Sequence, residues 1–237
     1  HMLNLDISHV LSTLAVAAVP ALLGIILHEV AHGWVAYRCG DPTAKFMGRL
    51  TVNPLPHIDP MGLLAFVLTS LSGAFVFGWA KPVPVNPRYF RNPAKDMMLV
   101  ALAGPLTNFL LAGLFGILLW AVLHIFPPQQ WMDSTSYVFA LKTIQTGVII
   151  NFGLGWLNLM PIPPLDGSKV VAYFLPFNAA LRYLSVERFG FIILLGLLFT
   201  GLFCLLLAPE FYAPLRRLAA HYHDRANALA AVAEIEH

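Results

Sequence analysis

The stretch His28-Glu29-Val30-Ala31-His32 places an H-E-x-x-H motif inside an apolar segment that is long enough to cross a lipid bilayer. Between Asp6 and Arg38, Glu29 is the only formally charged side chain. A carboxylate is costly to bury in such a segment, which indicates a functional role. On a helix, His28 and His32 share a face, so both imidazoles can bind one metal ion, with Glu29 beside them to act on a water molecule.

The composition indicates an integral membrane protein. Of the 237 residues, 58% are hydrophobic and only 11% are charged, whereas soluble domains carry roughly 25% charged residues. The lipid bilayer is therefore an expected partner, and we expect the chain in the inner (cytoplasmic) membrane. A net charge of +2 gives no reason to expect a nucleic acid partner. The two cysteines, Cys39 and Cys204, lack metal-site spacing and are interpreted as free thiols.

The hydropathy pattern predicts an all-α polytopic membrane protein with about four to six transmembrane helices. Four apolar segments reach the spanning length of about 20 residues, and they cover residues 10–37, 97–126, 136–157 and 189–208. A fifth segment, residues 61–80, is also of spanning length, but it contains three glycines and is bracketed by prolines.

The charge pattern predicts how this fifth segment behaves. Lys and Arg cluster both after the first span (38–49) and before the second (81–95), and the positive-inside rule places both clusters in the cytoplasm. Residues 61–80 then enter the membrane and return as a re-entrant segment, or lie along its surface; a true crossing is the alternative. The site near His28 would face the cytoplasmic side. The exact number of spans and the side of the C-terminus stay open.

The remaining segments complete the expected organisation. Residues 3–208 form the core, and residues 209–237 a helical C-terminal tail. Residues 48–53 are typical of a strand in a small membrane-associated β-hairpin. Such a strand can bind an extended substrate, with Asn53 as a contact, but an ordinary structural hairpin is an equally good interpretation. Residues 169–188 mix apolar and charged side chains, as an interfacial helix does.

A catalytic zinc site has three protein ligands, and Asp166 is the best placed candidate for the third. The other histidines fall at span ends, in the tail or, for His57, in a proline-rich loop. Asp166 lies near the end of the run Asn158-Leu-Met-Pro-Ile-Pro-Pro-Leu-Asp166-Gly167, in which three prolines prevent the helix from continuing. A broken helix in a membrane protein usually lines a site, although an aspartate before glycine, taken alone, is more often a cap or turn residue.

Together these motifs resemble the site-2 protease family of intramembrane zinc metalloproteases. The resemblance extends over residues 22–167 and rests on H-E-x-x-H followed by N-x-x-P-x-P-P-L-D-G. Ala103-Gly-Pro-Leu-Thr-Asn108 and the proline-rich run 77–87 reinforce it. The loops leave no room for a PDZ insertion, so the chain resembles a compact form of the family.

The resemblance implies that His28, His32 and Asp166 bind one Zn²⁺ per chain and that Glu29 is the general base. It also implies that Asn108 and Asn158 face the site and help to hold the substrate, although such amides can equally join helices. The implied reaction is hydrolysis of peptide bonds within or near transmembrane segments of single-span proteins.

Two alternatives to this reaction stay open. One is a membrane protein that binds helices without cutting them. The other is an H-E-x-x-H protease of a kind that uses a glutamate as third ligand. The oligomeric state is not indicated by the sequence.

Overall fold

The structure is a computed structural model that describes residues 7–72 and 79–199. The chain forms two units, residues 1–185 and 186–237. The described helices of the first unit are α1 (Ile7–Cys39), α2 (Thr43–Phe46), α3 (Pro60–Ser72), α4 (Pro93–Ile125), α5 (Pro128–Trp131), α6 (Thr135–Leu159), α7 (Asp166–Phe174) and α8 (Phe177–Leu184), with 3₁₀ turns at Leu55–His57 and Pro87–Tyr89. The second unit contains α9 (Glu187–Phe199). The tail, 209–237, lies outside the described residues.

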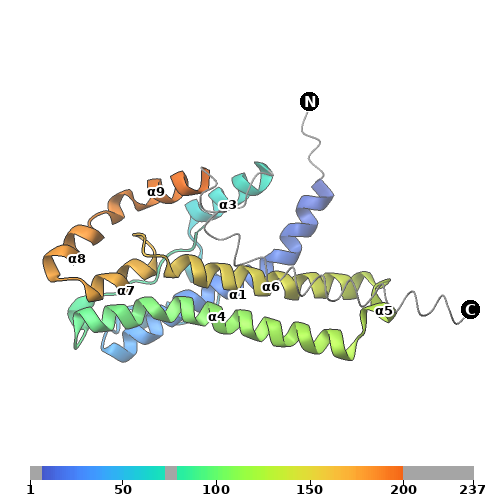
Figure 1. Cartoon of the computed structure of the whole chain (residues 1–237), viewed down its shortest axis with the longest axis horizontal. Coiled ribbons are helices and arrows are strands. Elements are labelled where there is room, and N and C mark those ends of the chain that lie inside the picture. The colour runs from blue at the N-terminus through green and yellow to red at the C-terminus, as the bar shows by residue number, and fades with distance from the viewer. Residues whose placement is uncertain (1–6, 73–78, 200–237) are drawn as a thin grey trace, which may run out of the picture. The chain divides into compact units, whose positions relative to one another are not determined.

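Three helices in the described part of the chain are long and apolar enough to cross a membrane, over Leu14–Cys39, Pro93–Ile125 and Thr135–Leu159. They belong to α1, α4 and α6, which pack against one another (Figure 1). Large apolar side chains on α4 point outward, with Leu110 70% and Ile117 65% exposed, as expected for a lipid-facing surface. The predicted membrane-protein class is confirmed. The fourth predicted span, 189–208, begins in α9 and continues beyond the described residues.

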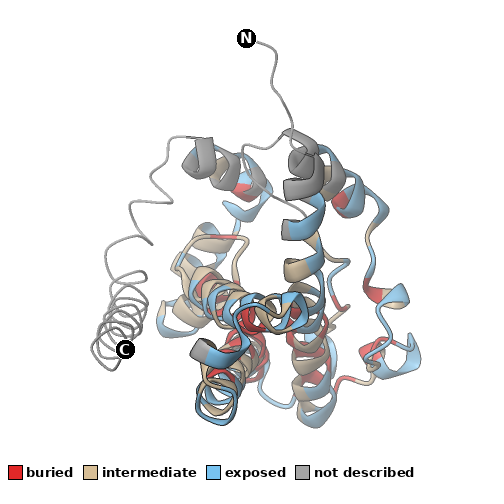
Figure 2. Cartoon of the chain, turned by 90° about the vertical axis from the view of Figure 1, so that its right-hand side faces the viewer, coloured by how far each residue is buried: buried red, intermediate tan, exposed pale blue. Residues whose placement is uncertain are grey.

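The contacts among these three helices contain buried polar side chains. Asn108 on α4 and Asn151 on α6 are fully buried, and the buried residues lie mainly where the helices face one another (Figure 2). Gly24 on α1 packs directly against the Asn151 side chain, where a Cβ atom would collide with its amide oxygen. Small residues thus let the three backbones approach closely around a polar interior.

The helix ends follow local sequence signals. Gly40 has a φ of +114° and ends α1, while the Asp41 N–H bonds back to the Ala36 carbonyl over 2.9 Å, a glycine-terminated helix end. Helix α6 ends at Leu159, and the chain is not helical again until α7 begins at Asp166. The prediction that the prolines break this helix is confirmed.

The strand predicted at residues 48–53 is not formed; this segment consists of turns and bends. Its side chains satisfy neighbouring backbone groups instead. The Thr51 hydroxyl accepts from the Asn53 N–H over 3.1 Å, and Asn53 Oδ1 accepts from the Leu55 N–H over 3.1 Å. Such local bonds compete with strand pairing. An isolated antiparallel bridge joins Ile58 to Ala80 nearby, and the described residues contain no longer ladder.

The Ile58–Ala80 bridge brings together the two ends of the segment predicted to be re-entrant. The Lys81 N–H also donates to the His57 carbonyl over 2.9 Å. Within the segment, α3 ends at Ser72, and residues 73–78 lie outside the described residues. After the bridge, residues 81–86 form an irregular segment that we call the strap.

The predicted interfacial helix, 169–188, is interrupted in the structure. Pro176 separates α7 from α8 because proline cannot continue a helix. Phe174 and Phe177, on either side of the break, are 74% and 76% exposed. The exposed aromatic side chains fit the predicted interfacial position.

Candidate metal centre

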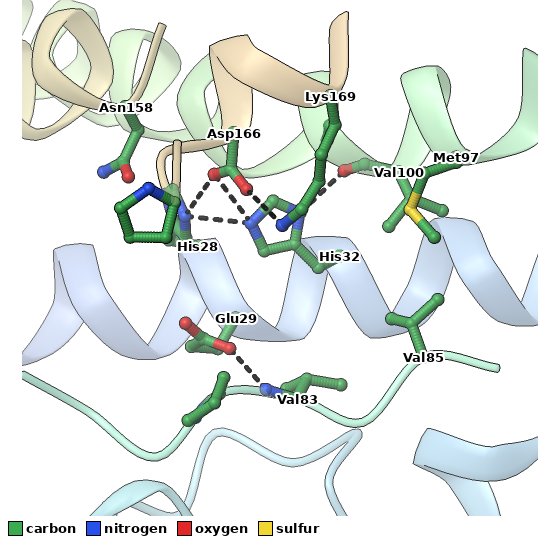
Figure 3. Close-up of a pocket in the computed structure, with 13 residues that line it drawn as sticks. His28, Glu29, His32, Val83, Val85, Met97, Val100, Asn158, Asp166 and Lys169 are labelled. Carbon is green, nitrogen blue, oxygen red and sulfur yellow. Dashed lines mark hydrogen bonds and ion pairs between the residues drawn. The ribbon is translucent and has the colours of Figure 1, made fainter. Parts of the chain in front are cut away.

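Three side chains that offer metal-binding atoms meet at one point, as Figure 3 shows. His28 and His32 lie one turn apart on α1, with their Nε2 atoms 2.9 Å apart. Asp166, the first residue of α7, places Oδ2 3.1 Å from each of these nitrogens. The unwinding of α6 allows this approach, and a Cβ on Gly167 would collide with the Leu159 and Met160 backbone. The structure therefore brings together the three predicted ligands.

The opposite nitrogen of each imidazole is hydrogen-bonded to an acceptor. His32 Nδ1 donates to the Val100 carbonyl over 2.6 Å. His28 Nδ1 lies 2.6 Å from Oδ1 of Asn108, whose Nδ2 donates to the Gly24 carbonyl over 3.1 Å. Since the amide nitrogen faces a carbonyl, the amide oxygen accepts from His28. These acceptors assign the proton of each neutral imidazole to Nδ1, so that each Nε2 carries a lone pair.

The resulting donor set fits a zinc ion. Two imidazole lone pairs and one carboxylate oxygen converge without a hydrogen-bond donor between them, an arrangement that requires a shared cation or proton. Their separations of 2.9–3.1 Å are close to the about 3.3 Å between neighbouring ligand atoms of a tetrahedral zinc with bonds near 2.0 Å. Gly104 on α4 leaves room for the imidazoles, because a Cβ there would lie 2.5 Å from His32 Nε2.

The charge on Asp166 is stabilised by its neighbours. Burial alone would raise the pKa of Asp166, but the imidazoles of His28 and His32, whose protonated forms donate to the carboxylate and attract it, hold the pKa below its usual range. Lys169, one turn later on α7, lies 3.6 Å from Oδ1. Asp166 is therefore an ionised ligand candidate at neutral pH.

Glu29 projects from α1 toward the strap rather than toward the meeting point of the other three side chains (Figure 3). Its Oε2 accepts a hydrogen bond from the Val83 main-chain N–H over 2.7 Å. Glu29 nevertheless lines the same cavity as His28, His32 and Asp166. This cavity has a volume of about 380 Å³. The cavity, whose lining is both polar and apolar, gives water and a substrate segment a place to reach these groups.

The other predicted site residues occupy different positions. Asn158 lines the cavity, and its Nδ2 donates to the Leu154 carbonyl over 2.9 Å. Asn108 is fully buried behind His28 and is not among the cavity-lining residues. Asn53 is exposed in the irregular segment and does not line this cavity. His57 is not part of the cluster either; its Nε2 lies 2.9 Å from the Thr51 carbonyl oxygen.

Some residues at or near the site were not predicted. Among them, Val83 and Lys169 line the cavity, Gly104 lies against the imidazoles, and Asn151 bonds to Asn108 behind His28. Lys169 follows Asp166 by one helical turn, so its position could have been inferred from spacing. Gly104 lies within the quoted A-G-P motif, but its contact with the histidines depends on how α1 and α4 cross. Val83 lies within the quoted run 77–87, whereas Asn151 lies in none of the quoted motifs. The contacts of both residues are with distant segments, so sequence spacing could not reveal them.

Comparisons with known proteins agree with this geometry. The Peptidase family M50 model matches residues 16–201. "Putative zinc metalloprotease YwhC" of Bacillus subtilis is 34% identical over 84% of this chain and 87% of its own length. "Putative zinc metalloprotease Rip2" of Mycolicibacterium smegmatis is 30% identical over 76% of this chain and 64% of its own length. "Putative zinc metalloprotease MJ0611" of Methanocaldococcus jannaschii is 33% identical over 63% of this chain and 65% of its own length.

No solved structure gave a significant match. The family match covers most of the chain, and the alignment with the Bacillus relative covers 84% of it. The chain therefore belongs to peptidase family M50, the site-2 protease family that its motifs resemble, and is a membrane zinc metallopeptidase.

Proposed function

We propose that this chain hydrolyses peptide bonds within or beside the transmembrane segments of single-span membrane proteins. Zinc is held by His28, His32 and Asp166, and Glu29 is the general base. The observation that carries this proposal is the convergence of three lone-pair donors at a cavity beside membrane-length helices.

Each residue has a chemical task in this reaction. Bound zinc supplies a Lewis acid that polarises the scissile carbonyl and lowers the pKa of a water molecule. Glu29 accepts a proton from the attacking water and delivers it to the leaving amine nitrogen as the C–N bond breaks. The Val83 N–H holds one oxygen of Glu29 and so restricts its orientation.

Asn158 is suited to bind the substrate. One hydrogen of its Nδ2 is donated to Leu154, and the second can be donated to a substrate carbonyl or to the developing oxyanion. In Asn108, the amide oxygen is bonded to His28 and the amide nitrogen to the Gly24 carbonyl. These bonds favour a role in orienting His28 over contact with a substrate.

The substrate must unwind before it can be cut. A transmembrane helix satisfies its own backbone hydrogen bonds, so its carbonyls are not free to reach the metal. Helix-breaking residues near the scissile bond should therefore favour cleavage. Residues 61–80 are proposed to enter and leave the membrane on the cytoplasmic side, and the cavity is proposed to open on the same side. The Ile58–Ala80 bridge, which joins the two flanks of this segment, supports the return of the segment to its starting side.

Cleavage of a panel of single-span substrates in liposomes tests the proposal, with the wild type compared with Glu29→Gln. We expect the variant to lose cleavage by several orders of magnitude while it retains the wild-type zinc content. If Glu29→Gln cuts as well as the wild type, Glu29 is not the base. If neither protein cuts but both bind the substrates and zinc, the chain is a helix-binding protein instead.

A further inference from the structure

We propose that Asn151 is a positioning residue of the metal centre. It acts through Asn108 to keep the proton of His28 on Nδ1, which leaves the Nε2 lone pair for the metal. The inference rests on the proposed function, in which His28 binds zinc. Asn151 itself contacts none of the three ligands, and it lies on α6, whereas His28 lies on α1.

The amide of Asn151 has one favourable orientation. The side chain is fully buried, and its Nδ2 donates to the Gly147 carbonyl over 2.9 Å and to the Pro20 carbonyl over 3.4 Å. Backbone carbonyls only accept, so a reversed amide would place an oxygen against two oxygens. In a buried site, this loss of both hydrogen bonds is costly. The Oδ1 of Asn151 must therefore face Asn108.

The orientation of Asn108 follows from that of Asn151. Asn108 Nδ2 donates to Asn151 Oδ1 over 3.2 Å and to the Gly24 carbonyl over 3.1 Å. Both hydrogens of this amide are thereby used, and its Oδ1 is directed at His28 Nδ1, 2.6 Å away. Since Oδ1 only accepts, the nitrogen facing it carries the proton. Carbonyls at one end of this chain of hydrogen bonds thus determine the tautomer of the metal ligand at the other end.

The two histidines differ in the kind of acceptor that their Nδ1–H groups face, and only the acceptor of His28 needs to be held in one orientation. His32 donates to the Val100 backbone carbonyl, an acceptor that cannot reverse its role. His28 donates to a side-chain amide, which would present N–H groups if it turned by half a rotation. An N–H group facing Nδ1 would favour the proton on Nε2, where it blocks the metal. The Gly24 carbonyl opposes this rotation, and the second amide, Asn151, adds a second acceptor that opposes it as well.

Gly24 is part of the same arrangement. A Cβ at this position would collide with Asn151 Oδ1 and would lie 3.2 Å from its Cγ. The α1 backbone therefore approaches the Asn151 amide as closely as only glycine permits. Substitution of Gly24 offers an independent way to displace this amide from the opposite helix.

The competing interpretation is that Asn151 only joins helices. To separate the two, we would compare the wild type with Asn151→Leu, which keeps the number and branching of the side-chain heavy atoms but removes the hydrogen bonds. Zinc affinity is measured on the full chain in nanodiscs by competition with a chelator. The His28 tautomer is read from ¹⁵N chemical shifts of histidine-labelled, zinc-free protein, with the His28 signals assigned from their loss in His28→Ala.

Ile144→Ala is the matched control. Ile144 lies on the same helix, in the buried cluster with Leu119 and Leu141, so its truncation weakens helix packing without touching the amides. We expect Asn151→Leu to weaken zinc binding about tenfold, the low end of the range for ligand-orienting residues, and to raise the population of His28 protonated on Nε2. Ile144→Ala should change neither quantity.

Unchanged zinc affinity or an unchanged His28 tautomer in folded Asn151→Leu would overturn the inference and leave Asn151 as a packing residue. If Asn151→Leu does not fold, zinc affinity and the His28 tautomer are measured in Gly24→Ala instead, and an unchanged value of either would overturn the inference. His28→Ala distinguishes this result from failure of the proposed function. Loss of zinc in His28→Ala with no effect of Asn151→Leu rejects only the inference, whereas unaltered zinc binding in His28→Ala rejects the metal site itself.

Discussion

The main-chain N–H of Val83 donates to Oε2 of Glu29 over 2.7 Å, although 54 positions separate the two residues in the sequence. The strap thereby holds the proposed base from outside α1, while Asp166 approaches the histidines from α7 (Figure 3). A hydrogen bond to a charged group is worth about 1.5–3 kcal/mol, enough to select one orientation of a carboxylate.

This contact predicts that Val83→Pro impairs catalysis but not metal binding. Proline removes the N–H, and Val83 already stands between two prolines, so the strap can accept another. We expect kcat/KM to fall about tenfold or more, with zinc content unchanged. Val85→Pro is the matched control, because Val85 also follows a proline in the strap, whereas the hydrogen bond to Glu29 comes from Val83. Equal losses in both variants would mean that strap shape, not this bond, matters.

Gly104 should be intolerant of even one added carbon. A Cβ would lie 2.5 Å from His32 Nε2 and 2.6 Å from His28 Nε2, so Gly104→Ala must push the imidazoles away from their present positions. We expect zinc affinity, measured by chelator competition, to drop at least tenfold. In Gly113→Ala, on the same helix, the new Cβ meets nothing within 4 Å, and the exchange should stabilise the helix by up to about 1 kcal/mol. Equal zinc affinity in the two variants would contradict the close approach of the histidines to α4.

Asn158 and Asn108 should give different kinetic phenotypes. Asn158 lines the cavity, so Asn158→Ala should retain zinc while kcat falls about 10²–10³-fold if its amide stabilises the oxyanion. Asn108 bonds His28 instead, so Asn108→Ala should weaken zinc binding about 10–100-fold. Zinc titration and single-turnover cleavage distinguish the two. A normal zinc affinity in Asn108→Ala would return Asn108 to the substrate-contact role predicted from the sequence.

Much of this centre follows from local sequence patterns, and the remainder depends on tertiary contacts. The H-E-x-x-H spacing places His28 and His32 on one helix face, and the prolines before Asp166 predict the break that lets it turn inward. The prediction of a strand at residues 48–53 was wrong, because Thr51 and Asn53 form hydrogen bonds with nearby backbone groups instead of with a neighbouring strand. Asn151 could not be predicted as a functional residue, since its role depends on the packing of α6 against α1 and α4.

Zinc affinity should fall steeply on mild acidification. A proton and a zinc ion compete for Nε2 of each imidazole ligand, so protonation of either ligand weakens zinc binding. Asp166 does not add to this loss. Its lowered pKa means that the carboxylate stays ionised above the unfolded value of about 3.9, and its contribution is lost only as the pH falls further. Chelator competition between pH 7 and 5 measures this, and an affinity independent of pH would contradict proton competition at the imidazole nitrogens.

The central claim is that His28, His32 and Asp166 form the zinc ligand set, and X-ray absorption at the zinc edge tests it most directly. For the wild type loaded with about one zinc per chain, we predict two imidazole nitrogens at about 2.0–2.1 Å, oxygen in the remaining positions and no sulfur. Asp166→Ala should lose zinc affinity and change the oxygen shell, while both imidazole signals remain. A sulfur ligand, fewer than two imidazoles, or an identical spectrum and affinity in Asp166→Ala would contradict the account.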